Sequence, residues 1–219
     1  MIIINDAITD DQINLIRSYV SDHADRKYTN WVENNEVIDN RWTLPLKNPN
    51  FSFIQKLVEQ YFNDWTGLWS AYQIQTNPHN IHIDEYGKEV WPNTKCWTYI
   101  LAFDTVPEFN TIIWKEQFRD GESFNKWVEH FWSTNDQKCA FKKSISQTQD
   151  LEHTYDVNNQ DYLVDYLTLE GVFTYKKGSA VLFDGNKLHC TSNWRKYPKF
   201  SQRELLQIHV LSKSPKFDC

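Results

Sequence analysis

Short runs of β-forming residues limit the possible fold of this chain more than any other feature of its sequence. Val, Ile, Thr and aromatic residues dominate each run, and Asn, Pro, Gly and Asp separate one run from the next. Many short strands with such turn residues are typical of a β-sandwich or a jelly roll. The runs that we interpret as strands cover residues 69–76, 81–84, 96–103, 111–115, 171–175, 180–183 and 204–211.

Two amphipathic helices are predicted before these strands, within residues 9–64. Thr9 followed by Gln12 has the pattern of a capping box, and Ser52 followed by Gln55 repeats it. Apolar side chains then recur at the spacing of one helical face. We therefore expect a mainly β fold with supporting helices on one outer side. The apolar positions are Ile13, Ile16 and Val20 in the first helix, and Ile54, Leu57, Val58, Tyr61 and Phe62 in the second.

A long segment at about residues 116–170 interrupts the succession of strands. Its first part, after Ser123, has the apolar spacing of a third helix, whereas residues 133–160 are polar and weakly patterned. A connection of this length in a compact domain is usually functional or mobile. We interpret it as an insertion in a single domain of residues 1–219. Two interpretations of its role are open: a lid over a binding site, or a surface decoration.

The charge balance argues against nucleic acid as a partner. The chain carries 23 Lys and Arg against 29 Asp and Glu, a net charge of −6, whereas nonspecific nucleic-acid binding depends on clustered basic residues. No apolar run approaches the length of a membrane span, and the N-terminus lacks a signal pattern. The four cysteines lack the close spacing of a zinc or redox motif. We therefore expect a cytoplasmic protein with reduced cysteines.

The segment His82-Ile83-Asp84 is a candidate metal site. On a β-strand, residues i and i+2 point to the same face, so this imidazole and this carboxylate would converge on one point. They could supply two ligands of a 2-His-1-carboxylate triad, which is typical of non-haem iron(II) oxygenases. His-x-Asp also occurs often by chance, and the alternative is an ordinary surface strand end.

Two later residues complete the candidate site. His189 follows a turn, a buried strand and a turn in residues 178–185, and only the fold could bring it to His82. Arg203 opens the last predicted strand, and a guanidinium can clamp a carboxylate with two parallel hydrogen bonds. The alternative for Arg203 is a surface salt bridge, with Arg195 as the rival carboxylate ligand.

Three further positions bear on this site. We expect His79 at the surface or behind the metal ligands, and His209 in a packed, hydrogen-bonded position on the last strand. In the strand at 96–103, either of the two alternating faces could line a cavity. We predict that Tyr99 is a pocket residue on this strand.

Together these motifs resemble the 2-oxoglutarate/iron(II)-dependent oxygenase superfamily, particularly its small prolyl-4-hydroxylase-like members. The resemblance covers most of the chain except the segment at 116–170. It implies a double-stranded β-helix, that is, a jelly-roll, cupin-like core. It rests on the opening strand and helix, on His82-x-Asp84, on the strand at 96–101, on residues 110–114 (which lack the family's glycines), on residues 177–185 with His189, and on Arg203.

The resemblance also implies a site and a reaction. An enzyme of this kind uses Fe2+, 2-oxoglutarate and O2, and it converts 2-oxoglutarate to succinate and CO2 while it oxidises a substrate, usually by hydroxylation. We expect the substrate to be a small molecule or a protein side chain. The alternatives are a cupin-like metal enzyme that does not use 2-oxoglutarate, and a non-catalytic jelly-roll binding module. The residues concerned are His82, Asp84 and His189 for the metal, and Arg203, Tyr72 and Tyr99 for the co-substrate.

Overall fold

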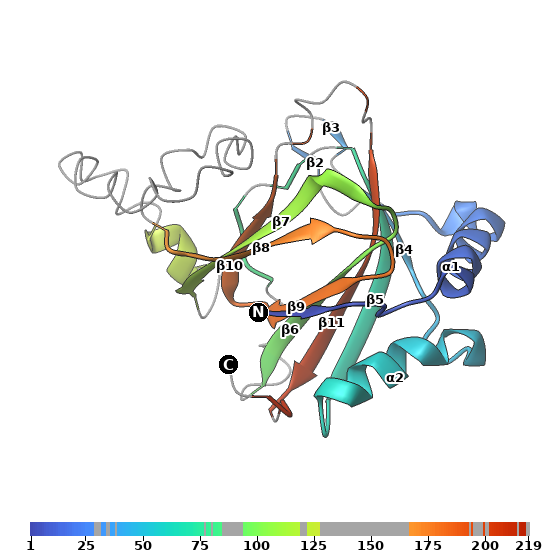
Figure 1. Cartoon of the computed structure of the whole chain (residues 1–219), viewed down its shortest axis with the longest axis horizontal. Coiled ribbons are helices and arrows are strands. Elements are labelled where there is room, and N and C mark those ends of the chain that lie inside the picture. The colour runs from blue at the N-terminus through green and yellow to red at the C-terminus, as the bar shows by residue number, and fades with distance from the viewer. Residues whose placement is uncertain are drawn as a thin grey trace.

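The computed structural model describes residues 1–28, 32–33, 36–37, 39–76, 78–79, 81–84, 94–118, 122–127, 167–192, 194, 199, 202–213 and 215–217. Within these residues the chain forms a larger and a smaller antiparallel β-sheet, with two α-helices beside the larger one (Figure 1). A short hairpin of β2 (Val32–Glu33) and β3 (Glu36–Val37) forms a third, two-stranded sheet.

The larger sheet has six antiparallel strands. The last strand of the chain, β11, pairs with β5 on one side and with β6 on the other, so it lies inside the sheet. Its side chains therefore reach the centre of the molecule on both faces. In spatial order the strands are β1 (Ile2–Ile4), β9 (Ala180–Asp184), β6 (Lys95–Ala102), β11 (Arg203–Ser212), β5 (Gly67–Gln75) and β4 (Asp39–Thr43).

The smaller sheet has the order β10 (Lys187–Thr191), β7 (Val106–Gln117) and β8 (Leu169–Tyr175). It packs on the larger sheet through a shared apolar core, which confirms the predicted mainly β fold with a jelly-roll core. This core consists of Ile100, Ala102, Phe109, Ile113, Phe173, Tyr175, Val181, Phe183, Trp194 and Leu205.

The helices α1 (Asp10–Asp22) and α2 (Ser52–Tyr61) cover the other face of the larger sheet. The capping box at Thr9 is present as predicted. The one at Ser52 is wrong, because a 3-10 turn, η2 (Pro49–Phe51), leads directly into α2 and leaves Ser52 already in helical geometry. A second 3-10 turn, η1 (Ala24–Arg26), follows α1.

Side-chain alternation in the larger sheet decides which residues reach the space between the sheets. On β6, Trp97 and Tyr99 pack under the helices, whereas Thr98 and Ile100 face the smaller sheet. On β5, Tyr72 also belongs to the core under the helices. The structure therefore corrects the prediction that Tyr72 and Tyr99 contact the co-substrate, since both rings are on the opposite face.

Some predicted segments differ from the structure or lie outside it. Residues 81–84 form a single bridge, between His82 and His189, rather than a strand of their own. The third helix is present at residues 122–127, while the rest of its predicted extent and the proposed lid at 133–160 lie outside the described residues. None of the described helices is long and apolar enough to cross a membrane.

Candidate metal centre and its pocket

Three candidate metal ligands meet beside β10. His82 and His189 exchange two backbone hydrogen bonds of 3.0 Å each, and their ring centroids lie 4.2 Å apart. The backbone N–H of Asp84 donates to the carbonyl of Gly185 over 2.8 Å, which fixes the carboxylate next to the two rings. One ligand atom from each of the three residues lies within 4.8 Å of the others. The structure thus brings together the three residues that the sequence singles out.

Asp84 is a buried, ionised carboxylate. Thr98 donates its hydroxyl to Oδ2 over 2.6 Å, while Oδ1 lies 4.0 Å from Nε2 of His82. Burial by itself would raise the pKa of Asp84, but three nearby histidines and the Thr98 hydroxyl outweigh burial and hold that pKa at about 2. The carboxylate therefore carries its negative charge at neutral pH, as a ligand for a cation requires.

His189 presents the nitrogen that a metal would use. Its Nδ1 lies 2.9 Å from the carbonyl oxygen of Lys187, which can only accept, so Nδ1 carries the hydrogen. The lone pair is therefore on Nε2. This nitrogen is buried, has no hydrogen-bond partner among the described residues, and lies 3.5 Å from Oδ2 of Asp84. Two imidazoles and a carboxylate are a donor set that suits Fe2+, so the residues present fit a non-haem iron site.

His209 supports Asp84 through Thr98. Burial lowers the pKa of His209 to about 4, so its ring is neutral at pH 7. The Thr98 hydroxyl has one hydrogen, which it donates to Asp84, so the contact of 3.2 Å between Thr98 Oγ1 and Nδ1 of His209 requires the imidazole to donate. Trp69 stacks on the His209 ring at 5.1 Å. His209 is packed and hydrogen-bonded, in the position that the sequence predicts.

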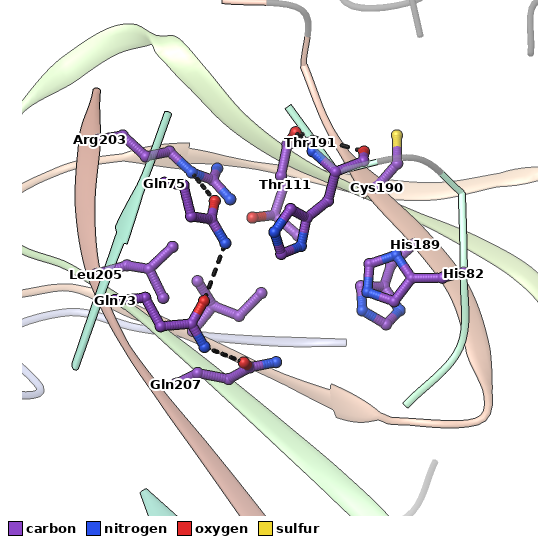
Figure 2. A pocket seen from close by; sticks show the side chains of 12 residues that line it. Gln73, Gln75, His82, Thr111, His189, Cys190, Thr191, Arg203, Leu205 and Gln207 are labelled. Carbon is purple, nitrogen blue, oxygen red and sulfur yellow. Dashed lines mark hydrogen bonds between the residues drawn. The ribbon is translucent and has the colours of Figure 1, made fainter. Parts of the chain in front are cut away.

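A pocket extends from the candidate ligands toward Arg203 (Figure 2). The empty space in and in front of it, open solvent included, is about 280 Å³. His82 and His189 lie at one end, and Arg203 lies at the other, with Gln75 and Gln73 on the same side as Arg203 (Figure 2). The two ends of the predicted site therefore share one pocket.

Arg203 is a buried cation without a described anionic partner. Its side chain is among the largest that are fully buried, and its guanidinium carbon lies 5.0 Å above the ring of Tyr175. Nε donates to Oε1 of Gln75 over 2.6 Å, but the buried Nη1 has no hydrogen-bond partner among the described residues. An uncompensated buried charge costs several kcal/mol, on the order of the ionic desolvation penalty. A carboxylate bound in the pocket would compensate this charge, which the described residues do not.

A second charged cluster borders the pocket and was not predicted. Asp39, which is fully buried, pairs with Nη2 of Arg41 at 2.6 Å and with Nε2 of His79 at 3.5 Å. His79 is 6% exposed and lines the pocket, so it lies behind the metal ligands rather than at the surface. No element was predicted for residues 39–43, which form β4 next to β5.

The polar wall of the pocket was also missed, although the sequence held a partial signal. Gln207 shares the predicted strand face of Arg203, and Gln73 and Gln75 share one face of the predicted strand at residues 69–76. On the strand at 96–103, the face of Thr98 and Ile100 was one of the two faces that could line the cavity. Amide and hydroxyl groups on a buried strand face indicate a polar cavity only once the fold shows which face is inside.

Comparisons with known proteins identify the fold. No protein-family model and no curated protein sequence matches this chain. SnoN, a non-heme alpha-ketoglutarate-dependent epimerase from nogalamycin biosynthesis, matches with a TM-score of 0.54 and 7% identity over 96% of this chain and 78% of that chain. A prolyl hydroxylase from Trichoplax adhaerens, in complex with a hypoxia-inducible factor peptide, matches with a TM-score of 0.53 and 8% identity over 97% and 83%. Iron-bound HygX from Streptomyces hygroscopicus matches with a TM-score of 0.50 and 13% identity over 99% and 82%.

Identities this low show the fold and not the activity. The chain has the fold of the iron- and 2-oxoglutarate-dependent oxygenases, which confirms the family resemblance at the level of fold. Other structures of the same neighbours contain Fe3+ with alpha-ketoglutarate in SnoN, and nickel with 2-oxoglutarate in HygX. The His82, Asp84 and His189 cluster is thus a possible metal site in a fold whose neighbours bind a metal and this co-substrate.

Proposed function

We propose that the protein is an Fe2+- and 2-oxoglutarate-dependent oxygenase that hydroxylates its substrate. One observation carries the proposal. His82 and His189, beside the ionised Asp84, lie at one end of a pocket, and the buried Arg203, which has no anionic partner among the described residues, lies at the other. A dicarboxylate with an oxo group at one end matches both features, since one end can chelate a metal and the other can accept from a guanidinium.

In this function each group has a defined task. His82, Asp84 and His189 would hold the metal on one side and leave the opposite positions open. Arg203 would bind the distal carboxylate of 2-oxoglutarate with its free Nη1, and its contact with Gln75 would fix the direction of the guanidinium. When bound, Fe2+ would activate O2 and couple the conversion of 2-oxoglutarate to succinate and CO2 to oxidation of the substrate.

The buried Arg203 also weighs against the two alternatives. A cupin-like enzyme without 2-oxoglutarate, or a jelly-roll module that binds something else, would leave this guanidinium uncompensated unless its own ligand were anionic. For the substrate we propose only a chemical class. SnoN was solved with nogalamycin RO and the prolyl hydroxylase with a peptide, so we propose a small molecule or a protein side chain.

Stepwise binding of metal and co-substrate tests the proposal. We expect Mn2+, which does not turn over with O2, to raise the melting temperature of the wild type, and 2-oxoglutarate to raise it further only when the metal is present. His189→Ala should abolish both increases. His23→Ala, at the end of α1 and remote from the pocket, is the matched control and should behave like the wild type. A 2-oxoglutarate effect that needs neither metal nor His189 would contradict the proposal.

A further inference from the structure

Three buried glutamines form a hydrogen-bonded chain along the wall of the pocket. We call Gln75, Gln73 and Gln207 the amide ladder. Arg203 Nε donates to Oε1 of Gln75, Nε2 of Gln75 donates to Oε1 of Gln73 over 3.0 Å, and Nε2 of Gln73 donates to Oε1 of Gln207. Figure 2 shows these three contacts in sequence along one side of the pocket. The rungs come from β5 and β11, which are paired neighbours in the larger sheet.

The arginine sets the direction of every amide in the ladder. A guanidinium can only donate, so the oxygen of Gln75 must face Arg203. The nitrogen of Gln75 then faces Gln73 and requires an oxygen there, and the same argument fixes Gln207. A flipped amide at any rung would oppose two donors or two acceptors inside a buried site, which costs about 1–3 kcal/mol for each unsatisfied group.

The last nitrogen of the ladder is a donor without a partner. Nε2 of Gln207 donates to none of the described residues, and Gln207 lines the pocket. Figure 2 shows this nitrogen pointing away from Gln73, on the side of His82 and His189. The strand register agrees, because Gln207 is two residues from His209 on β11, and His209 is paired with Thr98 of β6, which donates to Asp84. Along β11, Gln207 therefore lies between Arg203 and His209, and His209 is next to Asp84.

We propose that the amide ladder aims the NH2 group of Gln207 at the 2-oxo acid end of the co-substrate, so that Gln207 is a second binding residue beside Arg203. This inference rests on the proposed function, since it assumes that an oxo acid occupies the pocket. Arg203 recognises the distal carboxylate, and Gln207 recognises the carboxylate or keto oxygen at the metal end. Gln73 and Gln75 act through Gln207 as positioning residues, because their amides hold its donor in the required direction.

Two ligands test the two ends of the pocket independently. 2-Oxoglutarate has both ends, whereas 2-oxobutyrate keeps the 2-oxo acid and lacks the distal carboxylate. Each acid is titrated calorimetrically into the Mn2+-loaded protein. Gln207→Leu should weaken both acids by about tenfold or more, the effect of losing a hydrogen bond to a charged group. Arg203→Leu should weaken 2-oxoglutarate far more than 2-oxobutyrate, because it removes the contact with the distal carboxylate as well as the anchor of the ladder. Gln60→Leu, on the exposed side of α2, is the control and should change neither.

The ladder itself is tested by a double substitution. If Gln73 acts only by orienting Gln207, Gln73→Leu should weaken both acids, and Gln73→Leu/Gln207→Leu should be no weaker than Gln207→Leu alone. A purely structural role would give additive losses and a change in melting temperature without this pattern. Gln207→Glu, which keeps the side-chain shape and replaces the donor by a negative charge, serves if the leucine variant does not fold, and it should weaken both acids further.

The outcomes distinguish this inference from the function on which it rests. Wild-type affinity of the Gln207 variants for both acids, together with weakened 2-oxoglutarate binding by Arg203→Leu, would overturn the role of Gln207 and leave the proposed function standing. A wild-type protein that binds neither acid would overturn both. The inference is supported if Gln207→Leu loses affinity equally for the two acids. Gln73→Leu/Gln207→Leu should then bind both acids no more weakly than Gln207→Leu alone.

Discussion

Replacing Thr98 by valine removes one hydroxyl from the buried surroundings of Asp84 and leaves the shape of the side chain almost unchanged. Thr98 is fully buried, and its hydroxyl donates to Oδ2 of Asp84 over 2.6 Å. This donor occupies one carboxylate oxygen and leaves Oδ1, the oxygen nearer His82, free for a metal. The substitution should therefore affect both the stability of the metal-free protein and the direction in which Asp84 points.

The sizes of the two effects follow from the burial of Asp84, which is 6% exposed. A hydrogen bond to a charged group contributes about 1.5–3 kcal/mol, so the free energy of unfolding of the metal-free protein should fall by about that amount. Loss of a partner that orients a metal ligand typically weakens metal binding by about 10–100-fold. Thr98→Ser keeps the hydroxyl and should retain most of both quantities.

Urea unfolding of the metal-free protein and calorimetric titration with Mn2+ measure the two effects separately. We expect Thr98→Val to lose stability and metal affinity, and Thr98→Ser to lose little of either. A valine variant that unfolds more easily but binds Mn2+ with wild-type affinity would refute the argument that Thr98 orients Asp84 for a metal. A valine variant with unchanged stability would refute the hydrogen bond itself.

Three further predictions concern the pocket, the helix layer and pH. Arg203→Lys should weaken 2-oxoglutarate binding measured by calorimetry, because an ammonium lacks the two-pronged geometry of the guanidinium, and unchanged affinity would contradict this role. Ile54→Ala, in α2, should lower the free energy of unfolding by about 2–5 kcal/mol without changing Mn2+ affinity, since Ile54 is fully buried beneath the other face of the sheet. The pKa of His209 is lowered from 6.5 to about 4 in the folded protein, so the unfolded chain binds this proton more tightly and stability should fall as pH decreases from about 6.5 to 4. His209→Gln should make that fall shallower in urea unfolding of the metal-free protein, and identical pH profiles would contradict the assignment.

The candidate site was predictable where its geometry is local. His82 and Asp84 are two residues apart, and a single bridge to His189 with a backbone hydrogen bond from Asp84 to Gly185 is enough to bring them together. His189 and Arg203 could be placed because each adjoins a recognisable strand and because the whole pattern resembles one family. The jelly-roll fold was predictable because the short β-type runs are local patterns and because the whole pattern resembles one family.

The features that the sequence did not predict depend on contacts between strands that are far apart in the chain. Seven of the eight residues of β6 are buried, so its sequence does not show which face lies under the helices, and the choice of Tyr99 was wrong for this reason. The strand β4 was missed because Asp39 and Arg41 are polar residues at buried positions, where they form an ion pair. The amide ladder joins β5 to β11, and such a chain of amides has no signature in either segment alone.

Formation of succinate is the measurement that tests the central claim most directly. Purified protein is incubated with Fe2+, 2-oxoglutarate and air, without any other substrate, and succinate is quantified over time. Slow conversion without substrate is expected of an oxygenase of this kind. We predict succinate in the wild type and in the His23→Ala control, and none above the metal-free background in His189→Ala or in the absence of O2. No succinate from the metal-loaded wild type, or equal amounts from His189→Ala, would contradict the assignment.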